Sequence, residues 1–167
     1  NQPDSAIALL EEVIPIFEAA GDRYLEMNAR AQLSNAFYKK GQLETAVAKM
    51  EEAIALDPKL NYPTQAIYNF QLLGRIYQDQ NNLELALKNY KRSYHLHEKI
   101  GFNDELKTLL SDMASIYESL NNSDSALKYY QEYMAVSDSL YSQESQAQLN
   151  QLKAEYETDL QEEQLRN

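Results

Sequence analysis

Four alanines recur at a spacing of 40 residues, and this step limits most strongly how the chain can fold. They are Ala6, Ala46, Ala86 and Ala126. Other positions keep the same step of 40, namely Gly41, Asn81 and Asn121; Phe37, Tyr77 and Tyr117; and Leu33, Leu73 and Met113. A fixed period of about 20–50 residues is typical of stacked repeats, in which each unit buries its apolar face against its neighbours. The step therefore predicts a stacked repeat architecture.

Each repeat has the pattern of two helices joined by a short turn. In the second unit, Asp22 is a good N-cap for a helix over about 23–40, and Gly41 supplies the left-handed residue that ends it. A second helix starts near Leu43 and stops at Asp57-Pro58, because the residue before proline is pushed out of the helical region. The apolar residues of both helices step by three and four, which is the helical period.

The same pattern predicts the remaining helices and units. Further helices are expected over about 3–20, 63–80, 83–100 and 104–120, with Pro63 in a first turn, Gly101 at an end, Asn103 as a cap, and a last helix capped by Ser123 or Asp124. Pro15 should kink the first helix. The fold class is all-α, a superhelix (α-α solenoid) of antiparallel helix pairs over residues 1–141, with a truncated unit at 3–20 and full units at about 23–60, 63–100 and 103–141. The first unit lacks its first helix, and we expect the chain to be a piece of a longer protein.

The repeated alanines have a packing explanation. Where the two helices of a unit cross closely, a methyl group fits and a larger side chain would push them apart. Small residues also recur on the first helix of each unit, where they allow the same close approach, namely Ser34, Gly74 and Ala114. A large aromatic residue follows each of them three positions later. The alanines are therefore predicted to hold helices together and not to bind ligand.

The repeat pattern stops after Ser142, and residues 142–167 are predicted to form an extra C-terminal helix. Lys153, Glu157 and Arg166 occupy positions where the repeat needs a leucine, an aromatic residue and an alanine. Leu149, Leu152 and Tyr156 fit a short coiled-coil seam, but fewer than two heptads do not define one. Two alternatives remain open: a helix that caps the last repeat, or a linker helix that can dimerise through 143–166.

Composition excludes several function classes. The formal net charge is −11, which argues against nucleic acid and against an anionic membrane surface, since both attract basic proteins. The acidity has two readings, namely solubility or a basic partner. The absence of cysteine excludes disulfides and thiolate chemistry. No apolar run approaches 18 residues and no signal peptide pattern is present, so we expect no membrane insertion of this piece.

Catalytic and metal-binding patterns are missing from the sequence. His95 and His97 are the only histidines, and two residues apart on a helix they point about 200° apart, so they cannot share a metal. Acidic pairs such as Glu11-Glu12 are expected on solvated helix faces. No phosphate-binding loop, nucleophile elbow or zinc-protease motif occurs. We therefore predict no enzyme activity, no metal and no cofactor.

The repeat unit resembles the tetratricopeptide repeat. The family pattern Leu-Gly-x-x-Tyr…Ala…Phe…Ala is matched at Leu73-Gly74-Arg75-Ile76-Tyr77, Ala86, Tyr90 and Ser93, and the units at 33 and 113 match similarly. The family's first tryptophan is replaced by Arg30, Phe70 and Leu110, and the period is 40 rather than 34. The resemblance covers about residues 1–141 and implies a protein-binding solenoid.

The C-terminal segment is similar to the end of bacterial tetratricopeptide sensor domains. The matching residues are Ser137-Asp138-Ser139-Leu140-Tyr141 and Leu152-Lys153-Ala154-Glu155-Tyr156-Glu157-Thr158. In such proteins this helix leads to a transmembrane segment and then to a histidine kinase of a two-component system or a LuxR-type module. The resemblance implies a periplasmic sensing region of an inner-membrane protein.

A ligand is expected on the concave face, which the first helices line in this family. The outward positions there are Asn28, Gln32, Asn35, Tyr38, Tyr68, Gln71, Arg75, Gln78, Thr108, Ser111, Asp112 and Ser115. The family's clamp for peptide carboxylates needs basic residues where this chain has Ala31, Thr108 and Asp112, so binding of chaperone tails is not expected.

The predicted function is binding of a peptide or protein in the concave groove, as the ligand-sensing part of a bacterial signal-transduction protein. The alternative is a free-standing cytoplasmic scaffold or peptide-responsive regulator, similar to the 40-residue-period domains of quorum-sensing phosphatases. A fragment of an enzyme is a third reading, which no residue supports.

Overall fold

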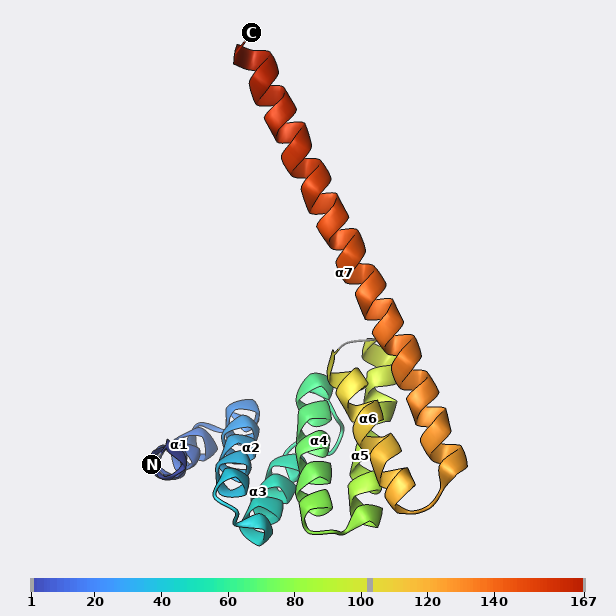
Figure 1. Ribbon diagram of the computed structural model, residues 1–167. Helices are drawn as coiled ribbons and strands as arrows, with labels where there is room; N and C mark the ends of the chain where they lie inside the picture. Colours follow the sequence, from blue (N-terminus) through green and yellow to red (C-terminus); the bar gives the residue numbers. More distant parts are fainter. Residues whose placement is uncertain (1, 102–103, 167) are drawn as a thin grey trace. The chain divides into compact units, whose positions relative to one another are not determined.

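The computed structural model describes residues 2–101 and 104–166, with side chains from 3 to 101 and from 104 to 155. The described residues form seven helices and no strand (Figure 1). These are α1 (Gln2–Ala20), α2 (Arg23–Lys39), α3 (Leu43–Ala55), α4 (Pro63–Asp79), α5 (Leu83–Ile100), α6 (Asp104–Ser119) and α7 (Ser123–Arg166). The chain divides into two compact units, Asn1–Gly101 and Phe102–Asn167. The predicted all-α fold class is confirmed.

Turn residues set the helix boundaries as predicted. The side chain of Asp22 accepts a hydrogen bond from the Leu25 N–H and caps α2. The three turn residues with the step of 40 all have left-handed φ values, namely Gly41 (77°), Asn81 (59°) and Asn121 (56°). Glycine and asparagine tolerate this region better than other residues, so the repeat of turns follows directly from residue type.

One predicted cap is wrong. The carboxamide oxygen of Asn122 accepts from the Ser125 N–H, so Asn122 caps α7 in place of Ser123 or Asp124. Asn82 does the same for α5 through the Leu85 N–H. In both turns the first asparagine adopts the left-handed conformation and the second caps the next helix. The predicted cap at Asn103 lies outside the described residues.

A buried carboxylate organises the loop between α3 and α4. Asp57 accepts hydrogen bonds from the N–H groups of Asn61 and Tyr62 and from the Asn61 amide. Burial alone would raise the pKa of Asp57, but these hydrogen bonds outweigh it and lower the pKa below its usual value. Pro63 then occupies the first turn of α4, as predicted.

Close helix crossings hold the first unit together. The Ser34 hydroxyl of α2 donates to the Ala46 carbonyl of α3 at 2.6 Å, and both residues are fully buried. In the next pair, Gly74 of α4 lies against the ring of Tyr90 on α5. Ala86 is also fully buried. The small residues therefore stand at the crossings that the sequence pattern predicted.

The position of the family's tryptophan holds a charged network in α2. Arg30 forms ion pairs with Glu26 at 2.8 Å and with Glu52 of α3 at 2.7 Å. Its side chain is largely buried, and its pKa is raised because these carboxylates outweigh the cost of burial. The guanidinium thus links α2 to α3 at this site.

The helix after the last turn differs from the predicted division at 142. α7 is one helix of 44 residues, so the second helix of the last unit and the C-terminal helix are continuous. Ala126, Tyr129 and Val136 are buried, and the Tyr129 ring stacks on Tyr117 of α6 with ring centroids 5.5 Å apart. Residues 141–155 are all exposed.

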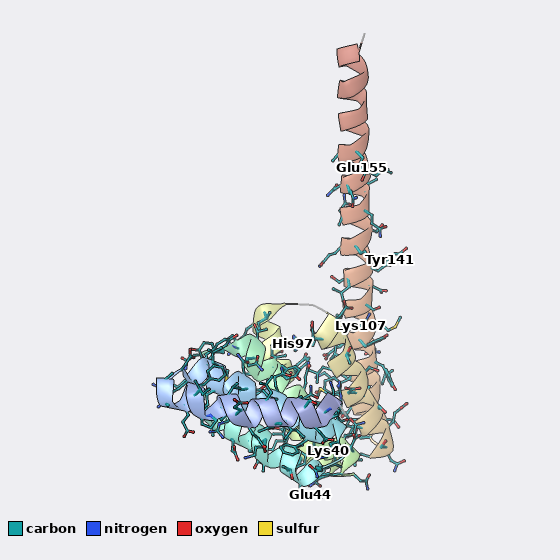
Figure 2. All side chains as sticks on the ribbon, turned by 90° about the vertical axis from the view of Figure 1, so that its left-hand side faces the viewer. Lys40, Glu44, His97, Lys107, Tyr141 and Glu155 are labelled. Carbon is teal, nitrogen blue, oxygen red and sulfur yellow. The ribbon has the colours of Figure 1, made fainter. Side chains whose placement is uncertain are left out.

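The exposed stretch of α7 continues past the first residues of α6, to which α7 runs antiparallel (Figure 1). Tyr141 and Glu155 both lie on it (Figure 2). Leu149 and Leu152 are 45% and 63% exposed, and the side chain of Tyr156 lies outside the described residues. The stretch does not cover the last repeat in this structure, and its roles as linker or dimer seam stay predictions.

Candidate ligand-binding face

The predicted ligand residues all lie on first helices, and none of them is buried. Asn28, Gln32, Asn35 and Tyr38 lie on α2; Tyr68, Gln71, Arg75 and Gln78 on α4; Thr108, Ser111, Asp112 and Ser115 on α6. α2 and α4 contact each other within the first unit. α6 belongs to the second unit, so its four residues are described on that helix alone.

A tyrosine–carboxylate hydrogen bond joins α2 to α4. The Tyr38 hydroxyl donates to the Asp79 carboxylate at 2.7 Å. Burial and the adjacent Asp79 raise the pKa of Tyr38 to about 12, although the positive charge of Arg75 opposes the shift. Tyr38 is therefore a neutral hydroxyl at physiological pH. Asp79 was not among the predicted residues. It lies four residues after Arg75, on the same face of α4, and this spacing could have identified it.

Arg75 lies within electrostatic reach of both predicted tyrosines. Its charge also opposes the rise in the pKa of Tyr68, which burial causes. Tyr68 and Arg75 are both exposed, whereas Tyr38 is half-buried. The α2–α4 surface thus carries two tyrosines, one cation and one anion, which we call the Arg75 face (Tyr38, Tyr68, Arg75 and Asp79).

Two predicted glutamines contact the neighbouring helix. The Gln71 amide nitrogen lies 3.2 Å from the Nε2 atom of His97 on α5, and the Tyr90 hydroxyl donates to Gln78 at 3.0 Å. His97 and Tyr90 are each 1% exposed. These glutamines therefore also stabilise the α4–α5 pair, a role that the register of one helix could not reveal.

Gln32 and Asn35 face a different hollow. A cavity of about 250 Å³ between α1 and α2 is lined by Ala6, Leu10, Gln32, Asn35 and Ala36 among others. By the 40-residue step Gln32 corresponds to Leu72, which is 5% exposed and packs in the cluster with α2 and α3. Gln32 is exposed, as predicted for an outward residue, although the equivalent position in the next pair packs between helices.

A second hollow, of about 310 Å³, lies where α2 and α4 begin. Tyr24 and Tyr62 form its aromatic edge, with ring centroids 4.7 Å apart and planes tilted by 50°. The sequence pattern did not predict it, because Tyr24 and Tyr62 do not share the 40-residue step.

The two histidines lie on different sides of α5. His95 is exposed and lies 3.1 Å from Glu98, whereas His97 is buried against α4. Among the described residues no three His, Asp or Glu side chains form a group that could hold a metal ion. Within the same residues, no helix combines the length and apolar character needed to cross a bilayer.

Comparison with known proteins places the repeats in one family. Two sequence models of the tetratricopeptide repeat match residues 28–60 and 64–139. Together these ranges span most of the second, third and fourth units. A search of curated proteins gave no match.

Solved structures share the fold at low sequence identity. A Podosopora anserina protein with nearly identical TPR-like repeats, described as a kinesin light chain, has a TM-score of 0.71 at 18% identity over 83% of this chain and 68% of that one. The TPR domain of Arabidopsis FLU has 0.63 at 19% over 70% and 98%, and the N-terminal domain of C. elegans STI-1 has 0.59 at 16% over 68% and 86%. The family models, the helix pairs and the similar solved structures agree. The chain therefore belongs to the tetratricopeptide repeat proteins, which generally serve as protein-interaction scaffolds.

Proposed function

We propose that this chain is the ligand-sensing part of a bacterial signal-transduction protein, and that it binds a peptide or protein segment on the Arg75 face. The observation that carries the binding site is the bridge between Tyr38 and Asp79, which joins two successive first helices into one surface. Exposed Tyr68 and Arg75 stand on that surface.

The chemistry of the Arg75 face favours an extended peptide with an acidic or carboxamide group. An arginine offers several N–H donors to a carboxylate or carbonyl, and an exposed tyrosine ring packs on an apolar side chain while its hydroxyl stays hydrated. The Asp79 carboxylate accepts a hydrogen bond from the Tyr38 hydroxyl and holds the Tyr38 ring in place. The face therefore combines a hydrogen-bonded pair, Tyr38 and Asp79, with the exposed side chains of Tyr68 and Arg75.

The long helix supports the signalling part of the proposal. α7 packs on α6 near its start and continues without interruption to Arg166. A continuous helix transmits a displacement better than a flexible linker, because its backbone hydrogen bonds resist bending. We further propose a periplasmic location, with α7 leading toward the membrane, following the resemblance of residues 137–141 and 152–158 to bacterial sensor domains.

Peptide selection tests the binding site. Linear peptides selected from a random display library on the purified chain should lose at least about tenfold in affinity, or 1.4 kcal/mol, with Tyr68→Ala or Arg75→Ala. Lys88→Ala, an exposed change on α5, is the matched control and should leave the dissociation constant unchanged. Selected peptides that bind all three variants equally would show that the Arg75 face is not the site.

The full open reading frame tests the sensor assignment separately. A transmembrane segment and an output module after residue 167 are expected. If the frame encodes neither, the sensor assignment fails and the cytoplasmic regulator takes its place, while the peptide-binding result stands or falls by itself.

A further inference from the structure

The last helix has a second apolar side, apart from the one that packs on α6. Successive residues of an α-helix are turned by about 100°, and on this geometry the exposed large apolar side chains described for α7 share one sector of about 100°. We call this sector the α7 stripe. Its members are Leu127, Tyr130, Met134, Tyr141, Leu149 and Leu152, and they are 36–76% exposed. The buried Tyr129, which stacks on Tyr117 of α6, and the buried Val136 lie on the opposite side. Tyr130 forms the edge nearest α6, where its hydroxyl donates to Glu118 at 3.1 Å.

The stripe keeps an 11-residue step, which suits a straight helix. Tyr130, Tyr141 and Leu152 are 11 residues apart, and Leu127 and Leu149 are twice 11 residues apart. Three turns of an α-helix take about 10.8 residues, so this step drifts around the helix less than a heptad step does. From its first to its last member the stripe is about 38 Å long, or nearly four heptads. An apolar pattern of that length is typical of helices that pair with other helices.

The stripe is open because α7 does not turn where the other second helices do. α3 ends at Ala55 and α5 at Ile100, and the chain then returns in α4 and α6. By the 40-residue step, Gly101, which follows α5 with a φ of 105°, corresponds to Tyr141. At Tyr141 the helix continues without a turn through residues 142–166 (Figure 2). The residues that would form the first helix of a following repeat are thus part of α7 itself and do not cover the stripe.

We propose that the α7 stripe binds the α7 stripe of a second copy of this chain, in parallel and in register. The interface extends the predicted seam at 143–166 to the half of α7 that packs on α6. A partner helix must match an 11-residue step over about 38 Å, and the chain's own α7 has this step. In a parallel pair each apolar residue of the stripe meets the same residue of the other copy. The dimer does not depend on the Arg75 face, which lies on α2 and α4.

The charged residues of the exposed stretch favour the parallel orientation. Residues 141–155 contain Glu144, Lys153 and Glu155 as their charged side chains. Glu144 and Glu155 are 11 positions apart on one edge of the stripe, and Lys153 lies on the other edge. In a parallel pair the basic edge of each copy faces the acidic edge of the other, whereas in an antiparallel pair like edges would meet. Opposite charges at an interface rim favour association, so the parallel pair is preferred.

One residue in the sector of the stripe opposes pairing. Asp138 lies between Met134 and Tyr141 on the same side of α7, and its side chain is exposed. In a parallel, in-register pair the two Asp138 carboxylates face each other and repel. A polar residue inside an apolar seam fixes the register at a cost in stability. We therefore expect a reversible dimer.

Sedimentation of the chain tests the interface. Wild type should dimerise, and Met134→Lys and Leu152→Lys should each raise the dissociation constant at least about tenfold, because each places an ammonium group among apolar side chains. Ala147→Lys, at an exposed position on the opposite side of α7, is the matched control and should leave the dissociation constant unchanged. Thermal unfolding of the monomers should be the same for all four proteins, since the three positions are exposed.

Three outcomes of the sedimentation experiment would contradict the proposal. A wild-type chain that stays monomeric at its highest soluble concentration would overturn the dimer. Equal weakening by all three lysines would show that the stripe is not the interface. An effect of Leu152→Lys without an effect of Met134→Lys would confine pairing to the exposed stretch, and the continuous stripe would be wrong.

Cysteine cross-linking tests the orientation, because the chain has no cysteine of its own. Ser145 lies in the sector of the stripe and Ala147 on the opposite side, and both are exposed. In a parallel, in-register pair the two copies of position 145 face each other at a distance that a disulfide can bridge. Ser145→Cys should therefore form a covalent dimer on mild oxidation, whereas Ala147→Cys should not. A dimer that cross-links equally at both positions, or at neither, would overturn the parallel register.

Removal of the like charges tests the register by a gain of affinity. Asp138→Asn should lower the dissociation constant by about threefold or more, because two carboxylates no longer face each other. Glu84→Gln removes the same charge at an exposed position of α5 and is the control for the change in net charge. If Asp138→Asn has no larger effect than Glu84→Gln, the two copies of Asp138 do not meet, and the in-register pair would be wrong.

Other occupants of the stripe are distinguished in the full-length protein. If Ser145→Cys cross-links in the chain of residues 1–167 but not in the full-length protein, another segment covers the stripe and the dimer proposal fails. Cross-linking in both supports it. Neither result bears on the peptide-selection experiment, which probes Tyr68 and Arg75 on α4, so the two proposals fail separately.

Discussion

The α2–α3 and α4–α5 pairs place a small residue at the same repeat position but fill the crossing differently. In α2–α3, the Ser34 hydroxyl donates a hydrogen bond to the Ala46 carbonyl, and Met50 lies one turn after Ala46 on α3. In α4–α5, the space that a side chain on Gly74 would need is occupied by the ring of Tyr90. The small residue at the repeated position allows the two helices of each pair to approach closely. The comparison teaches that this small residue and the side chain that faces it can be replaced only together.

The largest expected effect is overpacking at the repeated alanine. Ala86→Leu should lower the free energy of unfolding by about 1–3 kcal/mol, because Ala86 is fully buried and the added carbons would overpack the crossing. Ala46→Leu should cost less, since the flexible Met50 side chain can rearrange. Urea unfolding of both variants checks the order. Equal stability of Ala86→Leu and wild type would mean that this crossing is not close.

The second-largest effect is expected at Gly74, the small residue of the α4–α5 crossing. Gly74→Ala should destabilise by about 1–2 kcal/mol, since the new methyl displaces the Tyr90 ring from its buried position. In the Tyr90→Met background, which copies the α2–α3 pair, Gly74→Ala should be neutral or stabilising, because alanine favours a helix by about 1 kcal/mol over glycine. Thermal unfolding of the four proteins measures the coupling. Additive losses would contradict the explanation that the two residues can be replaced only together.

A smaller loss is expected where the crossing uses a hydrogen bond. Ser34→Ala should cost about 1 kcal/mol, the usual net contribution of one buried hydrogen bond. Ser111→Ala, at an exposed position of α6, is the control and should be close to neutral. Chemical denaturation distinguishes the two. A neutral Ser34→Ala would indicate that shape alone determines this crossing.

The loop after the α2–α3 pair and the end of the α4–α5 pair differ in chemistry. We therefore expect acid to lower the stability of the first more than that of the second. α3 is followed by the Asp57 loop, whereas α5 ends at Gly101 with a φ of 105°. Because the pKa of Asp57 is lowered by folding, its contribution is present above its unfolded pKa of about 3.9 and disappears as the pH falls through the lower folded value.

Comparison of wild type with Asp57→Asn across pH measures this contribution. The stability difference should be constant near neutral pH and shrink below about pH 4. Glu84→Gln, an exposed carboxyl change on α5, serves as the control. A difference that does not change with pH would assign the loop's stability to groups other than the Asp57 carboxylate.

The smallest effect is expected on the binding face. Arg75→Ala should change the free energy of unfolding by less than about 0.5 kcal/mol, because Arg75 is exposed. A larger loss by thermal unfolding would show that Arg75 supports the α2–α4 contact, and it would weaken its assignment as a ligand residue.

Helix boundaries followed from local chemistry and were therefore predictable. Asp22, Gly41 and Asn81 act through capping or left-handed φ values, which depend on the residue and its nearest neighbours. The close crossings were also predictable, because the 40-residue step repeats the same small residue. The candidate face was predictable only in part, since the contacts of Asp79, Gln71 and Gln78 depend on neighbouring helices.

The sequence by itself determined the helix pairs, their turns and the family, because each depends on patterns within one repeat. Tertiary structure decided which faces are covered: Leu72 is buried while Gln32 borders a cavity, and Leu96 is buried while Ile16 is exposed. The structure also shows that α7 continues beyond Ser142, for a reason that is local to the sequence. Loss of the apolar pattern ended packing there but not the helix, since no glycine or proline interrupts residues 123–166.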